Sequence, residues 1–234
     1  MKRIAAAFAL VLSASAQAGD LSSVGNLTQE QFRRLSEDLG AAVSYKGVTP
    51  ATPLGIVGFD IGVVATTTDI RNSSVFALAG AGGKSDIQTA KLHIYKGLVA
   101  GLDLGGFIGV TNGVSGEIYG VDLRYAFLDD TLTTPAFGVR ASGTMTNGLG
   151  AVDVSTLGLD FLLSKRFAVA TPYAGIGVVR VMSEPGVGGL QEENFTKGRG
   201  FVGLNVNLAV INVAFEAEKM GDNTSLSAKL GWRF

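Results

Sequence analysis

The sequence has no cysteine among its 234 residues, and it has only five prolines and one histidine. Without cysteine, the chain can form neither a disulfide framework nor a lipid-modified cysteine anchor. Its longest apolar run, Ile4 to Leu12, is too short for a membrane-spanning helix, which needs about 20 residues. These absences exclude a disulfide-stapled domain and a helical membrane protein.

The apolar run has the flanks of an export signal. Lys2 and Arg3 precede it, and small residues ending in "AQA" at 16–18 follow it. A basic region, a short apolar core and an A-x-A site are typical of a secretory signal peptide. We therefore assign residues 1–18 to a signal peptide, expect cleavage after Ala18, and expect the protein to be exported.

The sequence also has no large excess of positive or negative charge. Removing Lys2 and Arg3 from the 19 basic residues leaves 17 against 20 acidic residues, a net charge of −3 with no basic patch. This balance argues against nucleic acid as a partner. No metal-ligand cluster or cofactor motif is present, since the "GGKS" stretch at 82–85 has Leu78 where a phosphate-binding loop requires its first glycine. We predict neither a metal nor a cofactor.

Glycine is abundant instead, at 33 residues, roughly twice the usual ~7%. Apolar residues alternate with glycine and polar residues in many runs, down to the final "SLSAKLGWRF" at 225–234. Successive side chains of a strand point to opposite faces, so each run has one apolar and one polar face. Most of these runs reach the ~9–11 residues that cross an outer membrane as a tilted strand. We predict ten strands, at 55–66, 88–96, 98–111, 116–127, 134–145, 153–163, 168–181, 199–208, 211–219 and 225–234.

Long and short gaps between these strands fall on opposite sides. The gaps at 67–87 and 182–198 are long and rich in glycine, serine and asparagine, whereas 96–97 and 209–210 are short turns. Short turns at one end, longer loops at the other and an even strand count are typical of a transmembrane barrel. We predict an all-β fold, a closed antiparallel up-and-down transmembrane β-barrel of about ten strands over residues 55–234. Two further apolar stretches, 41–45 and 74–80, leave twelve strands as an alternative.

Aromatic residues on the predicted outer face cluster beside the short turns, as in a membrane-interface girdle. The terminal "KLGWRF", with Trp232 and Phe234, resembles the β-signal that the assembly machinery of bacterial outer-membrane proteins recognises. The strand pattern is similar to small OmpA-like and porin-like barrels. This resemblance implies location in the bacterial outer membrane, with outer-membrane lipid and the assembly machinery as partners. The sequence does not indicate an oligomeric state.

A different pattern precedes the barrel. Thr28 and Gln31 have the spacing of a capping box, and Phe32, Leu35 and Leu39 then keep helical spacing up to Gly40. We predict an amphipathic helix over 28–39 within a periplasmic segment, residues 19–54. The interpretation we favour places it against the barrel rim, and the alternative places it inside the lumen as a plug.

The polar face of the strands carries balanced charge. We interpret it as an internal network of ion pairs and hydrogen bonds in a narrow lumen, in preference to a selective channel. Inward glycines would leave room for water, a small solute or the helix. The predicted lumen-lining residues are Asp60, Lys91, His93, Asp103, Asp122, Arg124, Arg140, Asp160, Arg180, Glu216, Lys229 and Arg233.

Three functional classes follow from this pattern. The first is an integral barrel with a structural or small-solute passage role, and the second is a surface-binding barrel that acts through outer loops 67–87 and 182–198. The third is a barrel-embedded hydrolase, with His93 as general base and Asp103 to orient it. We do not favour catalysis and predict no catalytic residue, because His93 lies near the short turn at 96–97 and the outer loops contain no histidine.

Overall fold

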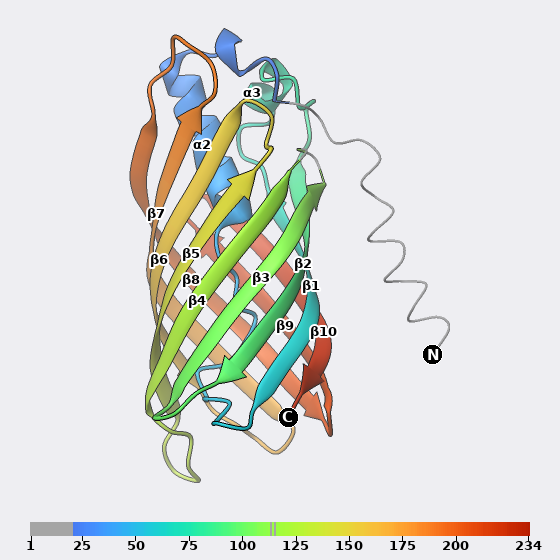
Figure 1. Ribbon diagram of the computed structural model, residues 1–234, viewed down its shortest axis with the longest axis vertical. Coiled ribbons are helices and arrows are strands. Elements are labelled where there is room, and N and C mark those ends of the chain that lie inside the picture. The colour runs from blue at the N-terminus through green and yellow to red at the C-terminus, as the bar shows by residue number, and fades with distance from the viewer. Residues whose placement is uncertain (1–20, 113, 115) are drawn as a thin grey trace, which may run out of the picture.

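The computed structural model describes residues 21–112, 114 and 116–234. The predicted signal peptide, residues 1–18, and the predicted cleavage site after Ala18 lie outside the described residues. Ten strands form one closed barrel in which each strand pairs with its neighbour in sequence and β1 pairs with β10 (Figure 1). All ten pairings are antiparallel. The strands are β1 (Phe59–Asp69), β2 (Asp86–Gly97), β3 (Leu102–Asn112), β4 (Glu117–Leu128), β5 (Ala136–Asn147), β6 (Val152–Ser164), β7 (Ala170–Pro185), β8 (Glu193–Leu208), β9 (Ile211–Met220) and β10 (Asn223–Arg233).

Strand alternation divides the wall into two faces, as the sequence predicts. On β4, for example, every second residue from Ile118 to Ala126 is buried and the residues between them are exposed. The exposed set is apolar, with Leu123 and Phe127 about half exposed at 47% and 53%. The ten-strand antiparallel barrel is therefore confirmed. The twelve-strand alternative is wrong, because residues 41–43 end a helix and most of 74–80 belongs to another, α3 (Ser73–Leu78).

The two ends of the barrel differ. We call the end that carries the β1–β2 and β7–β8 connections the outer end, and the end that carries the C-terminus the inner end (Figure 1). The β1–β2 connection spans residues 70–85 and contains α3. The predicted loop over 182–198 is wrong in extent, since the strands continue to Pro185 and resume at Glu193. Residues above an apolar belt need no alternation, so their sequence resembles a loop although their backbones pair, as Ser183 does with Glu193.

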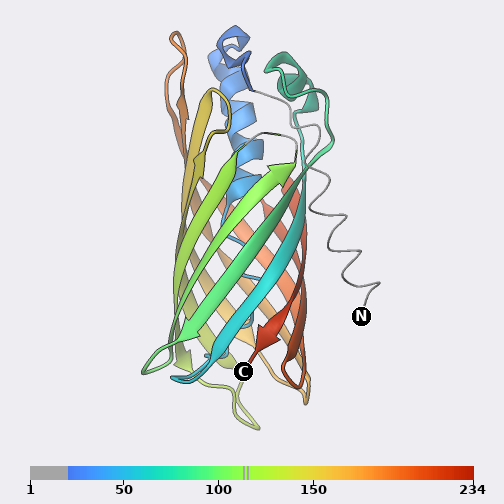
Figure 2. The same cartoon turned by 45° about the vertical axis from the view of Figure 1, so that its right-hand side comes forward.

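The N-terminal helix α2 (Gln29–Val43) lies inside the barrel, in its outer half (Figure 2). The predicted capping box is confirmed, because the Thr28 amide donates to Gln31 Oε1 at 2.8 Å and the Gln31 amide donates to Thr28 Oγ1 at 3.3 Å. The favoured position on the rim is wrong. The helix contacts seven strands around the wall, which only a position in the lumen permits. None of the described helices is long and apolar enough to cross a membrane.

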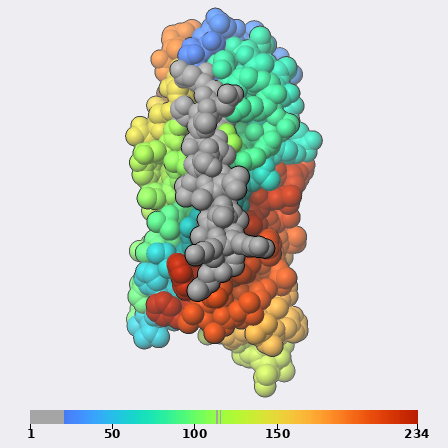
Figure 3. Space-filling model, turned by 90° about the vertical axis from the view of Figure 1, so that its right-hand side faces the viewer, coloured from blue at the N-terminus to red at the C-terminus, as the bar shows by residue number. Residues whose placement is uncertain are grey.

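The outer half of the lumen has an apolar core. Phe32, Leu35 and Leu39 of α2 are buried against wall residues such as Val154 and Val181. The short helix η2 (Val24–Asn26) and α3 extend this cluster above the strands. Figure 3 shows the N-terminal residues, in blue, beside the β1–β2 connection, in teal, at the outer end. The outer half of the lumen is thus closed by packed apolar side chains.

Inward glycines leave space that aromatic rings fill. A Cβ on Gly120 would lie 2.2 Å from the Phe107 ring, and one on Gly203 would lie 2.2 Å from the Tyr173 ring. Each ring lies across the glycine of the neighbouring strand, a pairing that lets a large side chain fit a narrow barrel. At these positions the space we expected for water or solute holds protein.

Candidate functional site

Below α2 the chain continues through the inner half of the lumen as an extended stretch, residues 44–54, which we call the lumen segment (Figure 2). Its residues 44–51 are all buried. The lumen segment leaves the barrel at the inner end, where residues 55–58 turn into β1. At its other end it continues directly from α2 inside the lumen. None of the described strands pairs with this segment, so its buried backbone polar groups need other hydrogen-bond partners.

Charged wall residues supply several of these partners at the inner end. Arg124 donates to the Pro50 carbonyl at 2.5 Å and to Thr49 Oγ1 at 3.2 Å. Asp103 accepts from the Leu54 amide at 3.0 Å and pairs with Arg124 at 2.5 Å. All of these wall groups are buried. One ion pair therefore stabilises two backbone groups of the lumen segment.

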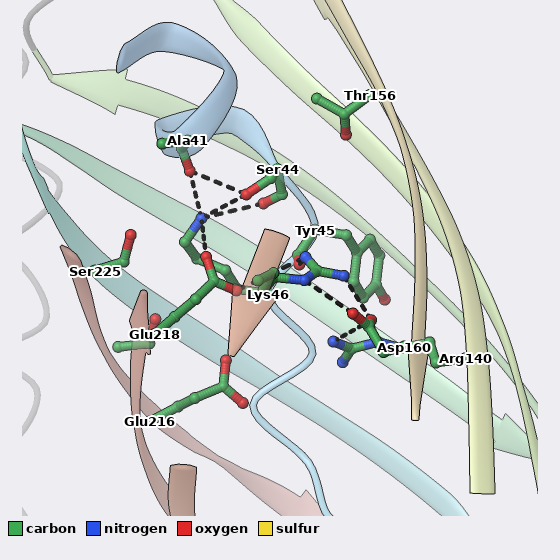
Figure 4. Close-up of polar contacts among 12 residues, drawn as sticks. Ala41, Ser44, Tyr45, Lys46, Arg140, Thr156, Asp160, Glu216, Glu218 and Ser225 are labelled. Carbon is green, nitrogen blue, oxygen red and sulfur yellow. Dashed lines mark hydrogen bonds and ion pairs between the residues drawn. The ribbon is translucent and has the colours of Figure 1, made fainter. Parts of the chain in front are cut away.

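A second anchor lies at mid-lumen (Figure 4). Asp160 of β6 pairs with Arg140 at 2.9 Å and with Arg199 at 2.5 Å, and Arg199 donates to the Tyr45 carbonyl at 2.7 Å. A Cβ on Gly47 would lie 2.0 Å from Arg140 Nη1. Only glycine fits there without a shift of Arg140, so the lumen segment runs directly against this ion-pair cluster.

Side chains of the lumen segment join the same network. Lys46 Nζ lies 3.3 Å from Glu218 Oε1 and donates to the Ala41 carbonyl at 2.6 Å, as Figure 4 shows. Tyr45 donates to Asp122 at 2.5 Å. Buried charges are tolerated only when they are paired and hydrogen-bonded, and here part of that pairing comes from the lumen segment itself.

A third cluster lies between β1 and β10. Asp60 Oδ2 accepts from Lys229 at 2.7 Å, Asp60 Oδ1 lies 2.6 Å from the same Nζ, and Arg233 is 3.7 Å away. Arg233 also donates to Thr49 Oγ1 at 3.3 Å. The inner, middle and β1–β10 clusters together contact the lumen segment from opposite walls. Their arrangement closes the inner half of the lumen with polar contacts, whereas apolar packing closes the outer half.

The structure places eleven of the twelve predicted lumen residues on the inner face of the wall. Ten are buried, and Arg233 has a side chain that is 11% exposed. Arg180 is the exception, and its predicted inward position is wrong. Its neighbours Val179 and Val181 face inward, and Arg180 is exposed and donates to Asn194 at 2.8 Å. It lies in the extended outer part of β7, where an outward charge is compatible with solvent. The buried residues are Asp60, Lys91, His93, Asp103, Asp122, Arg124, Arg140, Asp160, Glu216 and Lys229.

Two residues that the sequence analysis did not name are central to the network. Arg199 is the first residue of the predicted strand 199–208 and has the same strand parity as Gly203 and Asn205, so strand parity alone finds it. Lys46 precedes the first strand and has no periodic neighbours. No pattern in the sequence signals its position in the lumen.

His93 is enclosed by aromatic rings. It stacks on Phe107 with ring centroids 5.0 Å apart, and Tyr45 lies 5.9 Å away on the lumen side. Asp103, the acid that a catalytic pairing would require, bonds instead to Arg124 and to the Leu54 amide. The described residues therefore do not form the His93–Asp103 pair of the hydrolase hypothesis.

Polar contacts at the outer end join the first turns of α2 to the wall and loops. Arg33 pairs with Glu193 at 3.0 Å and Glu37 pairs with Lys197 at 2.9 Å. We call these two pairs the outer latch. Partial burial raises the pKa of Glu37, but hydrogen bonds and attraction from Lys197 and Arg33 outweigh it and hold the pKa below its ordinary value. Asp38 extends the contacts by accepting from the Asn72 amide at 2.9 Å.

Comparison with known proteins shows that the fold is similar to solved β-barrel structures. No family model and no curated protein matches the chain. Among solved structures, it is similar to the KdgM porin, with a TM-score of 0.39, 9% identity and coverage of 75% of this chain and 99% of that one. It is also similar to Ail, the attachment invasion locus protein of Yersinia pestis, solved with the heparin analogue sucrose octasulfate. There the TM-score is 0.30 and the identity 15%, over 76% of this chain and 97% of that one. These likenesses are to bacterial outer-membrane barrels and support no narrower family.

Proposed function

We propose that this protein is an integral outer-membrane barrel that its own N-terminal chain closes at rest, and that small solutes pass only when the lumen segment shifts. Membrane placement is supported by the outer face. Between the two ends its exposed side chains are mainly apolar, and Tyr125, Phe161 and Trp232 are among those that ring the inner end. Such a belt with an aromatic girdle is the surface that a bilayer covers.

The observation that carries the closed state is the filling of the lumen by α2 and the lumen segment. The contacts that α2 and the lumen segment make with the wall are hydrogen bonds, ion pairs and apolar packing, so they can break and form again. A closed barrel with a removable internal segment supports gated passage better than permanent flow.

Planar-bilayer recording of the full chain tests this proposal. We expect no steady current from the unaltered protein. In Arg124→Ala the Pro50 carbonyl loses its wall partner and Thr49 keeps only Arg233 of its two, so we expect brief openings to become more frequent. Asp153→Asn, which changes an exposed residue of the wall, is the matched control and should behave like the unaltered barrel.

A reversible lock assigns the openings to the lumen segment. Thr52 and Ser164 have side-chain oxygens 3.2 Å apart, and the chain has no native cysteine. In an Arg124→Ala background, Thr52→Cys with Ser164→Cys should abolish openings when oxidised and restore them when reduced. A steady current that is the same in the oxidised and the reduced variant would refute gating by the lumen segment. If the reduced variant shows no openings, the passage role is refuted and a purely structural role of the barrel is supported.

The shape of the outer end favours a second function, recognition at the cell surface. β7 and β8 have 16 residues each, against 10 to 13 in the other strands, and they project as a hairpin from the outer end. The outer latch connects this hairpin to α2. We would replace residues 188–192 by a Gly-Ser stretch of equal length and measure binding of expressing cells to a glycan array. The same replacement at 129–133, in an inner turn, is the control.

A further inference from the structure

The cleft at the inner mouth of the lumen collects two arginines without a matching number of acids. It has a volume of about 160 Å³, and its wall is mostly polar. Arg166 comes from the β6–β7 turn and Arg233 from β10. No Asp or Glu side chain is among the residues that line the cleft, which also include Phe234, the last residue of the sequence. The other polar side chains are those of Thr52, Thr171 and Asn207.

Each arginine shares its acid with a lysine that lies closer to it. Asp60 is 2.6 Å from Lys229 but 3.7 Å from Arg233. Asp130 is 3.1 Å from Lys165 but 3.6 Å from Arg166. In both clusters one carboxylate faces two cations, so each carries an excess positive charge. Both of the more distant cations are arginines, and both line the same cleft.

The excess positive charge is weakly screened by solvent here, because part of the cleft is buried. The side chain of Arg233 is only 11% exposed, and its one hydrogen bond among the described residues is to Thr49 Oγ1. A guanidinium has five N–H donors, so most of its capacity is unused. Buried cations in protein are normally paired with an anion. The ion pairs of the described residues include none between either arginine and the terminal carboxylate.

Neutral donors complete the lining. The Asn207 amide oxygen accepts from Asn212 at 2.7 Å, which leaves its NH₂ group to donate elsewhere. Thr171 is 3% exposed and adds a hydroxyl. Two planar guanidinium forks with amide and hydroxyl donors match the several acceptor oxygens of an oxyanion, which chloride lacks.

We propose that this cleft is a binding site for a small oxyanion, a phosphate or carboxylate group, at the inner mouth of the lumen. Pro50, Pro53 and Leu54 of the lumen segment also line the cleft, so a bound anion would contact both the wall and that segment. The site does not depend on whether the barrel conducts, because it is formed in the closed state.

Equilibrium dialysis of the full-length protein in detergent tests the site, with labelled inorganic phosphate and labelled acetate at constant chloride. We expect saturable binding of at least one of the two, and the tighter one identifies the anion class. Arg166→Gln should weaken that binding about tenfold or more, since it removes a charged hydrogen-bond donor. Arg166 has a 56% exposed side chain, so the variant should fold normally. Arg71→Gln, an exposed arginine at the outer end, is the matched control and should bind like the unaltered protein.

Binding that is not saturable for either anion would overturn the proposal, and so would equal affinity of Arg166→Gln and the unaltered protein. Arg233→Gln is a second test, with heat-modifiable gel mobility confirming that its barrel has formed. A folded Arg233→Gln barrel that keeps full affinity would also overturn the site. These outcomes are separate from the conductance result, which concerns movement of the lumen segment.

Discussion

Individual buried charges in this barrel do two things at once. Asp160 pairs with both Arg140 and Arg199, and through Arg199 it fixes the Tyr45 carbonyl of the lumen segment. Replacing such a network by apolar residues is often neutral, whereas removing one partner leaves a charge buried without compensation. The network therefore constrains position as well as charge, since its loss would free the segment that fills the lumen.

Asp160→Asn should destabilise the barrel by about 3–5 kcal/mol, because two buried guanidiniums would lose their shared anion while side-chain size stays the same. Denaturant unfolding of protein refolded in detergent measures the free energy of unfolding. Asp153→Asn on the same strand changes an exposed carboxylate and should cost at most about 0.5 kcal/mol. Equal costs for the two variants would mean that the buried pairings contribute nothing specific.

Most of these residues could be predicted from sequence because strand parity assigns each side chain to a face. Parity works for Asp103 or Arg140, which lie within long alternating runs. Strict alternation also places Arg180 outward and Arg199 inward, as the structure does, so the predicted inward position of Arg180 departs from the strand parity. Lys46 could not be found at all, since an extended segment without a strand partner has no periodicity.

At the scale of elements, the decisive feature is α2. Its capping box and apolar spacing predicted a helix, but an apolar stripe does not say which apolar surface it meets. The residues that follow the predicted helix, Ala41 to Val43, continue it and are buried, so it is enclosed on more sides than a rim helix would be. A helix bounded by wall all around needs fixing at its exposed end, and the outer latch provides that.

The outer latch makes the attachment of α2 pH-dependent. The pKa of Glu37 is below its ordinary value of 4.5 in the folded protein. Its contribution to stability is therefore complete above that ordinary value and is lost as the pH falls through the lowered one. Hydrogen exchange of the α2 amides should show a loss of protection between about pH 6 and about pH 3 that is smaller in Glu37→Gln.

Glu30→Gln is the control for this measurement. Glu30 lies on the same helix, and among the described residues it pairs only with its neighbour Arg34. Its side chain is 76% exposed, so the exchange profile of Glu30→Gln should follow that of the unaltered protein. A pH response of Glu37→Gln identical to that of the unaltered protein would show that the latch does not hold the helix through this carboxylate.

At the scale of the whole molecule, the barrel is a sheet with no free edge. In a bilayer each backbone N–H and C=O needs a partner within the protein, so closure of β1 on β10 is a condition for insertion. The seam continues beyond the ladder to Phe59 and Phe234, whose backbones exchange hydrogen bonds of 2.7 and 3.0 Å. Their rings stack on the outside with centroids 6.1 Å apart.

This pair separates assembly from stability. Phe234→Ala and Phe59→Ala each remove one ring of the same stack and keep the backbone bonds, so each should cost about 1–3 kcal/mol after refolding in detergent. If "KLGWRF" acts as the assembly signal that it resembles, only Phe234→Ala should lose outer-membrane yield in cells. The measurements are denaturant unfolding of refolded protein and the amount of heat-modifiable barrel in outer-membrane fractions. Equal yields for the two variants would show that Phe234 acts only as one side of the seam, because the stack is symmetric and a recognition signal is not.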